Sequence, residues 1–207
     1  YYADRYGVLV TGWHTLPSGK TYFFDTSGKA ITGKNRIKNV NYYFNQNGEL
    51  HHSGLNYNLS SDCALLINAD TGKVLYAKNE NVPHANASTT KIMTCILALE
   101  QGELEAEAGV SAYAASMPKV KLSVQQGEHY RLKDLLYALM LESFNDAAVV
   151  IAEEIGRKEV PGLKDRDPSG FSREESKEAV AAFAALMNEK AAGLGCENTW
   201  YITPNGL

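Results

Sequence analysis

Ser88 and Lys91 combine a hydroxyl and an amine at a spacing that suits nucleophilic chemistry. Residues three apart on a helix share a face, so Oγ of Ser88 and Nζ of Lys91 can meet. A serine at a helix N-terminus lies where unpaired N–H groups and the helix dipole favour an oxyanion. A lysine in a dry cleft can lose its proton and act as a base. The pair therefore predicts a serine acylation site, although Ser-x-x-Lys alone also fits an N-cap serine beside a solvated lysine.

A second candidate motif, Ser143-Phe144-Asn145, lies between two predicted helices, so its side chains can project from a turn. A hydroxyl there can relay a proton between Lys91 and a leaving nitrogen, and an amide can bind both the lysine and a substrate carbonyl. Alone, Ser-x-Asn is an ordinary loop sequence. Its place downstream of Ser88 and Lys91, in this order, makes the combination specific.

Hydrophobic periodicity predicts the elements that position these motifs. An apolar run from Ile92 to Leu99 predicts a helix that starts near Ser88, and residues 101–126 carry only weak signals, with a strand or loop at 120–124. The remaining predicted elements are a β-hairpin at 63–68 and 73–77, helices at 132–142 and 147–156, and a long helix at 172–192 that begins with a Ser172–Glu175 capping box.

Residues 1–56 differ from the rest because they repeat. Tyr22-Phe23-Phe24-Asp25-Thr26-Ser27-Gly28 reappears as Tyr42-Tyr43-Phe44-Asn45-Gln46-Asn47-Gly48, and Tyr1 to Gly12 aligns with Tyr22 to Gly33. A period of about 20 residues with aromatic triplets and glycine turns predicts stacked small hairpins. The aromatic residues Trp13, Tyr22 and Tyr42 fit packing between repeats, and alternatively contact with a cell-wall ligand.

Composition narrows the function classes. The 207 residues carry a net charge of −4, which argues against a nucleic-acid partner. We find no apolar run of membrane-spanning length and no leader; if the protein is exported, its signal peptide preceded Tyr1. The three cysteines, Cys63, Cys95 and Cys196, show neither metal-ligand spacing nor a disulfide framework, so we expect no metal and no cofactor.

Residues 62–207 resemble the serine D-Ala-D-Ala carboxypeptidases, the low-molecular-mass penicillin-binding proteins of the penicillin-recognising serine acyltransferases. The resemblance rests on Ile67 to Tyr76, Ser88 to Lys91, Asp134 to Ala147 and Thr203 to Leu207. It implies an α+β, β-lactamase/transpeptidase-like fold, with helices packed on an antiparallel sheet. It also implies that the enzyme removes the terminal D-alanine of peptidoglycan stem peptides through an acyl-enzyme and is acylated by β-lactam antibiotics.

The same resemblance assigns roles to the motif residues. Ser88 becomes the nucleophile, Lys91 its general base, Ser143 the proton relay and Asn145 the contact to lysine and substrate. The family's third motif, Lys-Thr-Gly, is not found in these residues. We therefore expect a catalytic domain that is truncated before its sheet is complete, with little or no turnover by this fragment alone.

The repeats resemble the choline- and glucan-binding repeats of Gram-positive surface proteins, through Gly12-Trp13 followed by Tyr22-Phe23-Phe24. Lys34 and Leu55 replace the tryptophan in the next two units, which favours a spacer or a glycan contact over a choline site. The resemblance implies an extracellular, wall-associated protein of Gram-positive type that acts on cell shape, with wall glycan or teichoic acid as a further partner. We divide the chain into repeats at 1–56, a linker at 57–61 and the catalytic part at 62–207.

Two alternatives stay open. The first is a non-catalytic wall-binding protein with a vestigial cleft, which the missing third motif favours. The second is a class A-like β-lactamase, which shares the first motif but needs a glutamate that activates the deacylating water. The available glutamates are predicted to lie on helix surfaces or in caps: Glu153, Glu154, Glu174 and Glu175.

Overall fold

The computed structural model describes residues 1–38, 40–54, 59–80 and 82–207. These residues form two compact units, Tyr1–His84 and Ala85–Leu207. The predicted linker at 57–61 lies partly outside the described residues, and Leu55, which replaces a repeat tryptophan, lies wholly outside them. The domain boundaries therefore stay a prediction. Among the helices that are described, none is both long and apolar enough to cross a bilayer.

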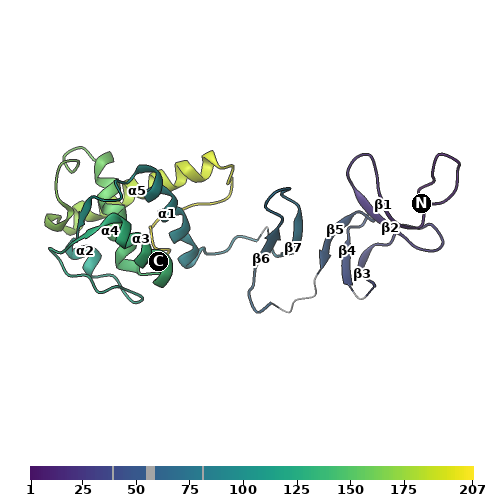
Figure 1. Ribbon diagram of the computed structural model, residues 1–207, viewed down its shortest axis with the longest axis horizontal. Helices are drawn as coiled ribbons and strands as arrows, with labels where there is room; N and C mark the ends of the chain where they lie inside the picture. Colours follow the sequence, from purple (N-terminus) through teal and green to yellow (C-terminus); the bar gives the residue numbers. More distant parts are fainter. Residues whose placement is uncertain (39, 55–58, 81) are drawn as a thin grey trace. The chain divides into compact units, whose positions relative to one another are not determined.

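The first unit consists of small antiparallel sheets (Figure 1). The predicted hairpin stack is confirmed, and so is the hairpin at 63–68 and 73–77. The strands are β1 (Gly12–Thr15) paired with β2 (Thr21–Phe24), β3 (Gly33–Ile37), β4 (Val40–Phe44) and β5 (Leu50–Gly54) in one sheet, and β6 (Ala64–Ile67) paired with β7 (Val74–Lys78).

One turn geometry closes three successive repeats. The Oδ1 atoms of Asp4, Asp25 and Asn45 each accept two backbone N–H groups, two and four residues ahead, at 2.8–3.0 Å. Gly28 and Gly48 complete two of these turns with positive φ, and a Cβ there would lie within 3 Å of the side chain of the preceding repeat. The repeated residues therefore encode both the turn and the close stacking of one hairpin on the next.

Trp13 packs against aromatic side chains of two successive repeats. Its ring lies 5.1 Å from Phe23, 4.7 Å from Tyr42 and 5.9 Å from Phe44, centroid to centroid. Two of these contacts are edge-to-face, the favoured arrangement of aromatic pairs. Trp13 nevertheless stays 42% exposed, so part of its ring remains available to a ligand.

Trp13→Ala is expected to lower the free energy of unfolding of the repeat unit by about 2 kcal/mol, because three ring contacts disappear. Denaturant titration followed by near-ultraviolet circular dichroism measures the loss. Trp200→Ala is the matched control, because Trp200 is 73% exposed in the other unit. Equal effects of the two substitutions would contradict the packing role.

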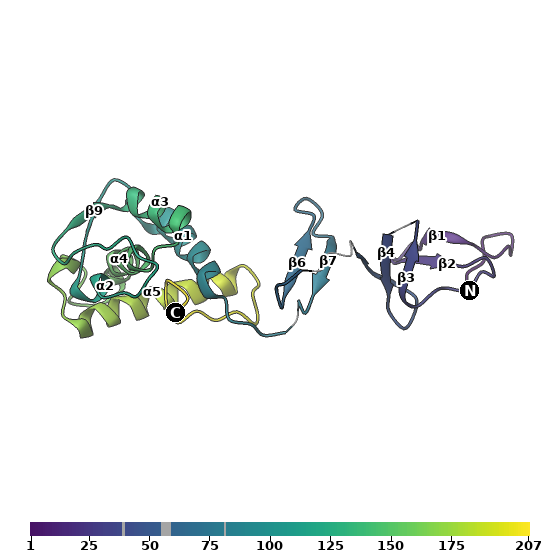
Figure 2. The same ribbon diagram turned by 90° about the horizontal axis from the view of Figure 1, so that it is seen from below.

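The second unit packs helices around one buried helix. The helices are α1 (Thr90–Gln101), α2 (Ala112–Ala115), α3 (Leu132–Glu142), α4 (Asn145–Gly156) and α5 (Arg173–Gly193), with a two-stranded sheet of β8 (Glu107–Gly109) and β9 (His129–Arg131). Every residue of α4 is buried, and Figure 2 shows it at the centre of the unit, with the other helices around it. The predicted helices and the capping box at Ser172 and Glu175 are confirmed.

The structure corrects one prediction and decides another. Glu153 and Glu154 do not lie on a helix surface: they are 0% and 6% exposed, since α4 is covered on all sides. Glu154 forms an ion pair with Arg157 at 2.7 Å, whereas Glu174 is exposed and Glu175 caps α5 as predicted. The segment 120–124, predicted as a strand or a loop, is a loop.

The buried carboxyl group of Glu153 accepts a hydrogen bond from Ser111 Oγ at 2.7 Å through Oε1. Its other oxygen and the nearby Ser176 hydroxyl have no hydrogen-bond partner among the described residues. Burial raises the pKa of Glu153 to about 7, and the Ser111 hydrogen bond opposes this shift only in part. The folded state therefore favours the neutral form of this carboxyl group.

The titration of Glu153 is expected to make stability depend on pH. Because the folded pKa lies above the usual 4.5, the associated stabilisation is complete below pH 4.5 and is lost as pH rises through 7, by about 3 kcal/mol. Glu153→Gln is expected to remove this slope, measured by urea unfolding at several pH values. The exposed Glu189→Gln should retain it; a slope unchanged in Glu153→Gln would contradict the assignment.

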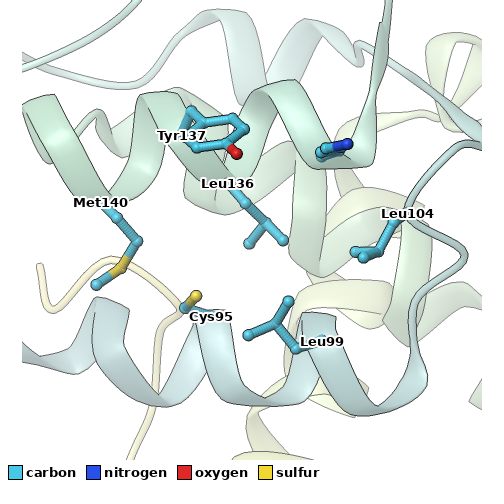
Figure 3. A pocket seen from close by; sticks show the side chains of 7 residues that line it. Cys95, Leu99, Leu104, Leu136, Tyr137 and Met140 are labelled. Carbon is cyan, nitrogen blue, oxygen red and sulfur yellow. The ribbon is translucent and has the colours of Figure 1, made fainter.

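An apolar groove of about 310 Å³ lies between α1 and α3. Figure 3 shows Cys95 and Leu99 on one side facing Leu136, Tyr137 and Met140 on the other. None of the predicted site residues lines this groove. This apolar groove is therefore lined by other residues than those of the candidate active site.

Candidate active site

Lys91 lies in the first turn of α1 and is only 2% exposed. Its Nζ atom has three hydrogen-bond partners: Asn145 Oδ1 at 2.9 Å, the backbone oxygen of Asn205 at 3.0 Å and Ser88 Oγ at 3.1 Å. Burial lowers the pKa of Lys91 below its usual 10.5. The amine is thus held at a fixed position in an environment that disfavours its charge.

The three partners of Lys91 differ in what they can do. Two are carbonyl oxygens, which only accept hydrogen bonds, so each requires an N–H of the amine. The third is a hydroxyl, which accepts from a charged ammonium and donates to a neutral amine. When Lys91 is neutral, its lone pair therefore points at Ser88 Oγ, which is the geometry of a general base.

Ser88 lies in the short 3₁₀ turn η1 (Ala87–Thr89) that leads directly into α1. The residue is exposed, so a substrate can reach its hydroxyl from solvent. Ala87 before it adopts a left-handed conformation with φ of 45°, a strained conformation for a residue other than glycine. Ser88 is therefore an accessible hydroxyl at a helix N-terminus, hydrogen-bonded to a buried amine.

Asn145 is the first residue of α4, and hydrogen bonds to both the oxygen and the nitrogen of its side-chain amide orient it. Its Nδ2 donates to the backbone oxygen of Pro118 at 3.2 Å, while its Oδ1 accepts from Lys91. Since a carbonyl oxygen cannot donate, this bond to Pro118 determines which end of the amide faces the lysine. The structure thus brings together three of the four predicted motif residues: Ser88, Lys91 and Asn145.

Ser143 is the fourth motif residue, and among the described hydrogen bonds its hydroxyl joins neither Ser88 nor Lys91. It caps α3 in a left-handed conformation with φ of 59°, is half-buried, and has no side-chain hydrogen bond among the described residues. A relay needs only to reach the proton in the substrate complex. The role of Ser143 stays a prediction.

The segment 203–207 completes the surroundings of Lys91, which motif spacing did not predict. Thr94 Oγ1 donates to the backbone oxygen of Pro204 at 2.6 Å, next to the carbonyl of Asn205 that binds Lys91. Gly206 has φ of 82°, and a Cβ there would lie 1.9 Å from the backbone oxygen of Ala87. The glycine in Thr203 to Leu207 is the sequence signal of this close approach.

A second residue that motif spacing missed is Asp146, which follows Asn145 and is 0% exposed. Its carboxylate accepts the backbone N–H groups of Leu122 and Ser123 at 2.9 and 2.7 Å. Its only sequence signal is an acidic residue in the first turn of a helix.

The predicted wall-ligand residues lie in the repeat unit and do not form one cluster. Trp13 and Tyr42 are in contact through their rings. Tyr22 instead stacks on Phe24 at 5.9 Å and donates through its hydroxyl to Glu49 Oε1 at 3.3 Å. Their role in ligand binding stays a prediction.

Comparison with known proteins finds two family models that match this chain. A family model described as D-alanyl-D-alanine carboxypeptidase matches residues 49–160, more than half of the chain. The chain belongs to this carboxypeptidase family. A second model, described as a choline-binding repeat, matches residues 10–53. Both resemblances inferred from the sequence are confirmed.

Curated members of the carboxypeptidase family are similar over most of this chain. The D-alanyl-D-alanine carboxypeptidase DacF of Bacillus subtilis is 39% identical over 149 residues, which are 70% of this chain and 33% of the relative. A D-alanyl-D-alanine endopeptidase of Pseudomonas aeruginosa is 32% identical over 155 residues, 74% of this chain and 43% of the relative. The chain thus spans well under half the length of these relatives.

Solved structures confirm the predicted α+β, transpeptidase-like fold. The carboxypeptidase DacD from Francisella tularensis superposes with a TM-score of 0.59 at 29% identity, covering 73% of this chain and 33% of that one. The K38H mutant of the Streptomyces K15 DD-transpeptidase gives a TM-score of 0.60 at 26% identity, covering 72% of this chain and 55% of that one.

Proposed function

We propose that this protein is a serine D-Ala-D-Ala carboxypeptidase that removes the terminal D-alanine of peptidoglycan stem peptides. The observation that carries the proposal is the amine of Lys91, which is buried, held by two carbonyl oxygens and aligned on the exposed hydroxyl of Ser88. Its family membership supports the substrate class. Residues 62–207 supply the N-terminal part of the catalytic domain.

The proposed reaction proceeds through an ester on Ser88. Lys91 takes the proton of the Ser88 hydroxyl while Oγ attacks the carbonyl carbon of the penultimate D-alanine. When the peptide bond breaks, the amine of the terminal D-alanine receives a proton through Ser143, and Asn145 orients the substrate carbonyl. Water then hydrolyses the ester, and a β-lactam acylates Ser88 by the same attack on its ring carbonyl.

We assign the repeats to attachment at the cell wall, outside the cell, in a Gram-positive envelope. Their match to choline-binding repeats and the partly exposed Trp13 support a wall ligand, either glycan or teichoic acid. Competition by choline distinguishes the two, because the replaced tryptophans favour glycan. Binding of the full-length protein to purified cell walls, with free choline as competitor, tests this assignment. Failure to sediment with the walls would contradict it.

The two alternatives to the carboxypeptidase differ in their predicted outcomes. Three of the four glutamates considered for a β-lactamase are engaged elsewhere: Glu153 with Ser111, Glu154 with Arg157 and Glu175 with Ser172 and Arg166. The fourth, Glu174, is exposed in the first turn of α5. A β-lactamase would release hydrolysed penicillin rapidly, whereas a carboxypeptidase retains the acyl group. A non-catalytic wall-binding protein would not react at all.

The deciding experiment incubates the full-length protein with a fluorescent penicillin and with an acylated L-Lys-D-Ala-D-Ala tripeptide. The expected result is one stable label per protein, mapped by mass spectrometry to the peptide that contains Ser88, together with release of D-alanine. Absence of both label and D-alanine release would reject the proposal. Rapid turnover of penicillin without D-alanine release would favour the β-lactamase instead.

A further inference from the structure

The carboxylate of Asp146 is fully buried and bonds to a run of backbone N–H groups in one loop. Its Oδ1 accepts from Leu122 at 2.9 Å, and its Oδ2 accepts from Ser123 at 2.7 Å and from Val124 at 3.3 Å. Oδ1 also accepts the N–H of Ala147 at 2.9 Å. Three consecutive backbone N–H groups of the loop therefore bond to one side chain at the start of α4, which ties the loop to this helix.

Ser123 shows why the loop needs this support. Its φ is 70°, a left-handed conformation that costs a residue other than glycine about 1–3 kcal/mol. The Ser123 N–H makes the shortest of the bonds to Asp146. The carboxylate therefore stabilises a backbone conformation that the loop would otherwise leave.

The upstream part of the same loop contacts the candidate active site. The backbone N–H of Asn145 donates to the oxygen of Val120 at 2.8 Å, and its side-chain Nδ2 donates to the oxygen of Pro118. This second bond turns Oδ1 of Asn145 toward Lys91. The 118–124 loop thus connects Asp146 at one end to Asn145 and Lys91 at the other.

We propose that Asp146 is a positioning residue for the acylation of Ser88: its buried carboxylate holds the 118–124 loop so that the loop orients the Asn145 amide toward Lys91. This inference rests on the proposed function, because it assigns Asp146 a role in that reaction. Asp146 itself touches neither Ser88 nor Lys91 in the described hydrogen bonds.

The test compares penicillin acylation rates of full-length wild type and Asp146→Asn. Asparagine keeps the shape, but its NH₂ group faces backbone donors and cannot accept from them. We expect acylation to slow by about 10- to 100-fold, as for a misplaced reacting group. Hydrogen exchange of the amides of residues 122–124 is expected to accelerate. An unchanged acylation rate or unchanged exchange would overturn the inference.

A double-mutant cycle separates positioning from general destabilisation. If Asp146 acts through Asn145, Asp146→Asn should have little further effect in an Asn145→Ala background. Full additivity would overturn the inference. Glu153→Gln is the matched control, since Glu153 is also a buried carboxyl group on α4 but bonds to Ser111 rather than to the 118–124 loop; it should acylate at the wild-type rate.

The outcomes also separate this inference from the proposed function. If wild type is not labelled by penicillin, both fail. If wild type is labelled and Asp146→Asn keeps the same rate, only the inference fails. If Asp146→Asn does not fold, judged by its helical circular dichroism, Asp146→Glu is used instead, because it keeps the charge but displaces the carboxylate by one methylene; the same rate criteria then apply.

Discussion

Ser88→Ala is expected to abolish covalent labelling by penicillin and the release of D-alanine, because it removes the atom that forms the ester. The alanine variant keeps the hydrogen bonds that Lys91 donates to Asn145 and Asn205, so the fold and the shape of the site should persist. The measurement is the stoichiometry of label after gel electrophoresis of the full-length protein, with mass spectrometry of the intact chain.

Thr89→Ala is the matched control for this experiment. Its hydroxyl is adjacent in the chain but donates to the backbone oxygen of Asn86 rather than to Lys91. We expect this variant to be labelled at nearly the wild-type rate. Label that survives Ser88→Ala, or is lost equally in Thr89→Ala, would reject Ser88 as the nucleophile.

Lys91→Met is expected to slow the acylation of Ser88 by about 10²- to 10⁴-fold, the usual range for loss of a general base. Methionine is similar in length and apolar, so it fills the buried space without a proton-accepting lone pair. It also leaves two carbonyl oxygens, of Asn145 and Asn205, without their donor, at a cost of about 1–3 kcal/mol each. Stopped-flow acylation kinetics and thermal denaturation separate the two effects.

The pH dependence of acylation provides the sharper readout. Lys91 acts as a base only when neutral, so wild-type acylation should increase as pH rises through the pKa of Lys91, which burial places below 10.5. This increase of the acylation rate with pH should be missing in Lys91→Met. Lys133→Met, an exposed lysine of α3, is the control that should keep it. A pH profile unchanged in Lys91→Met would reject the base assignment.

Local patterns in the sequence were sufficient for the first pair of site residues and for the longer helices and hairpins, but not for the short elements α2, β8 and β9. The Ser88–Lys91 contact depends only on a spacing of three at the start of a helix, which is a short-range property. The repeats, the helix boundaries around Ser143 and the Ser172 capping box are likewise encoded by neighbouring residues. Each of these interactions forms within one turn or one hairpin.

Local patterns could not predict which residues are buried, nor which polar groups distant in the sequence become hydrogen-bond partners. Helical periodicity assumes that a helix has an outer face, and α4 has none, which is why Glu153 and Glu154 were wrongly predicted to lie at the surface. The buried hydrogen bonds of Asp146 were missed for a related reason. Three of its four hydrogen-bond donors lie more than twenty residues upstream, in a segment without a recognisable motif.

The sequence by itself determined that a hydroxyl and an amine share one helix terminus, with an amide available in a later turn. Only the tertiary structure decided that Lys91 is buried, that Asn145 and Asn205 hold two of its hydrogen-bonding directions and that the third points at Ser88. The physical reason is that proton affinity depends on the solvation and partners of an amine. Folding brings those partners together from positions 54 and 114 residues away along the chain.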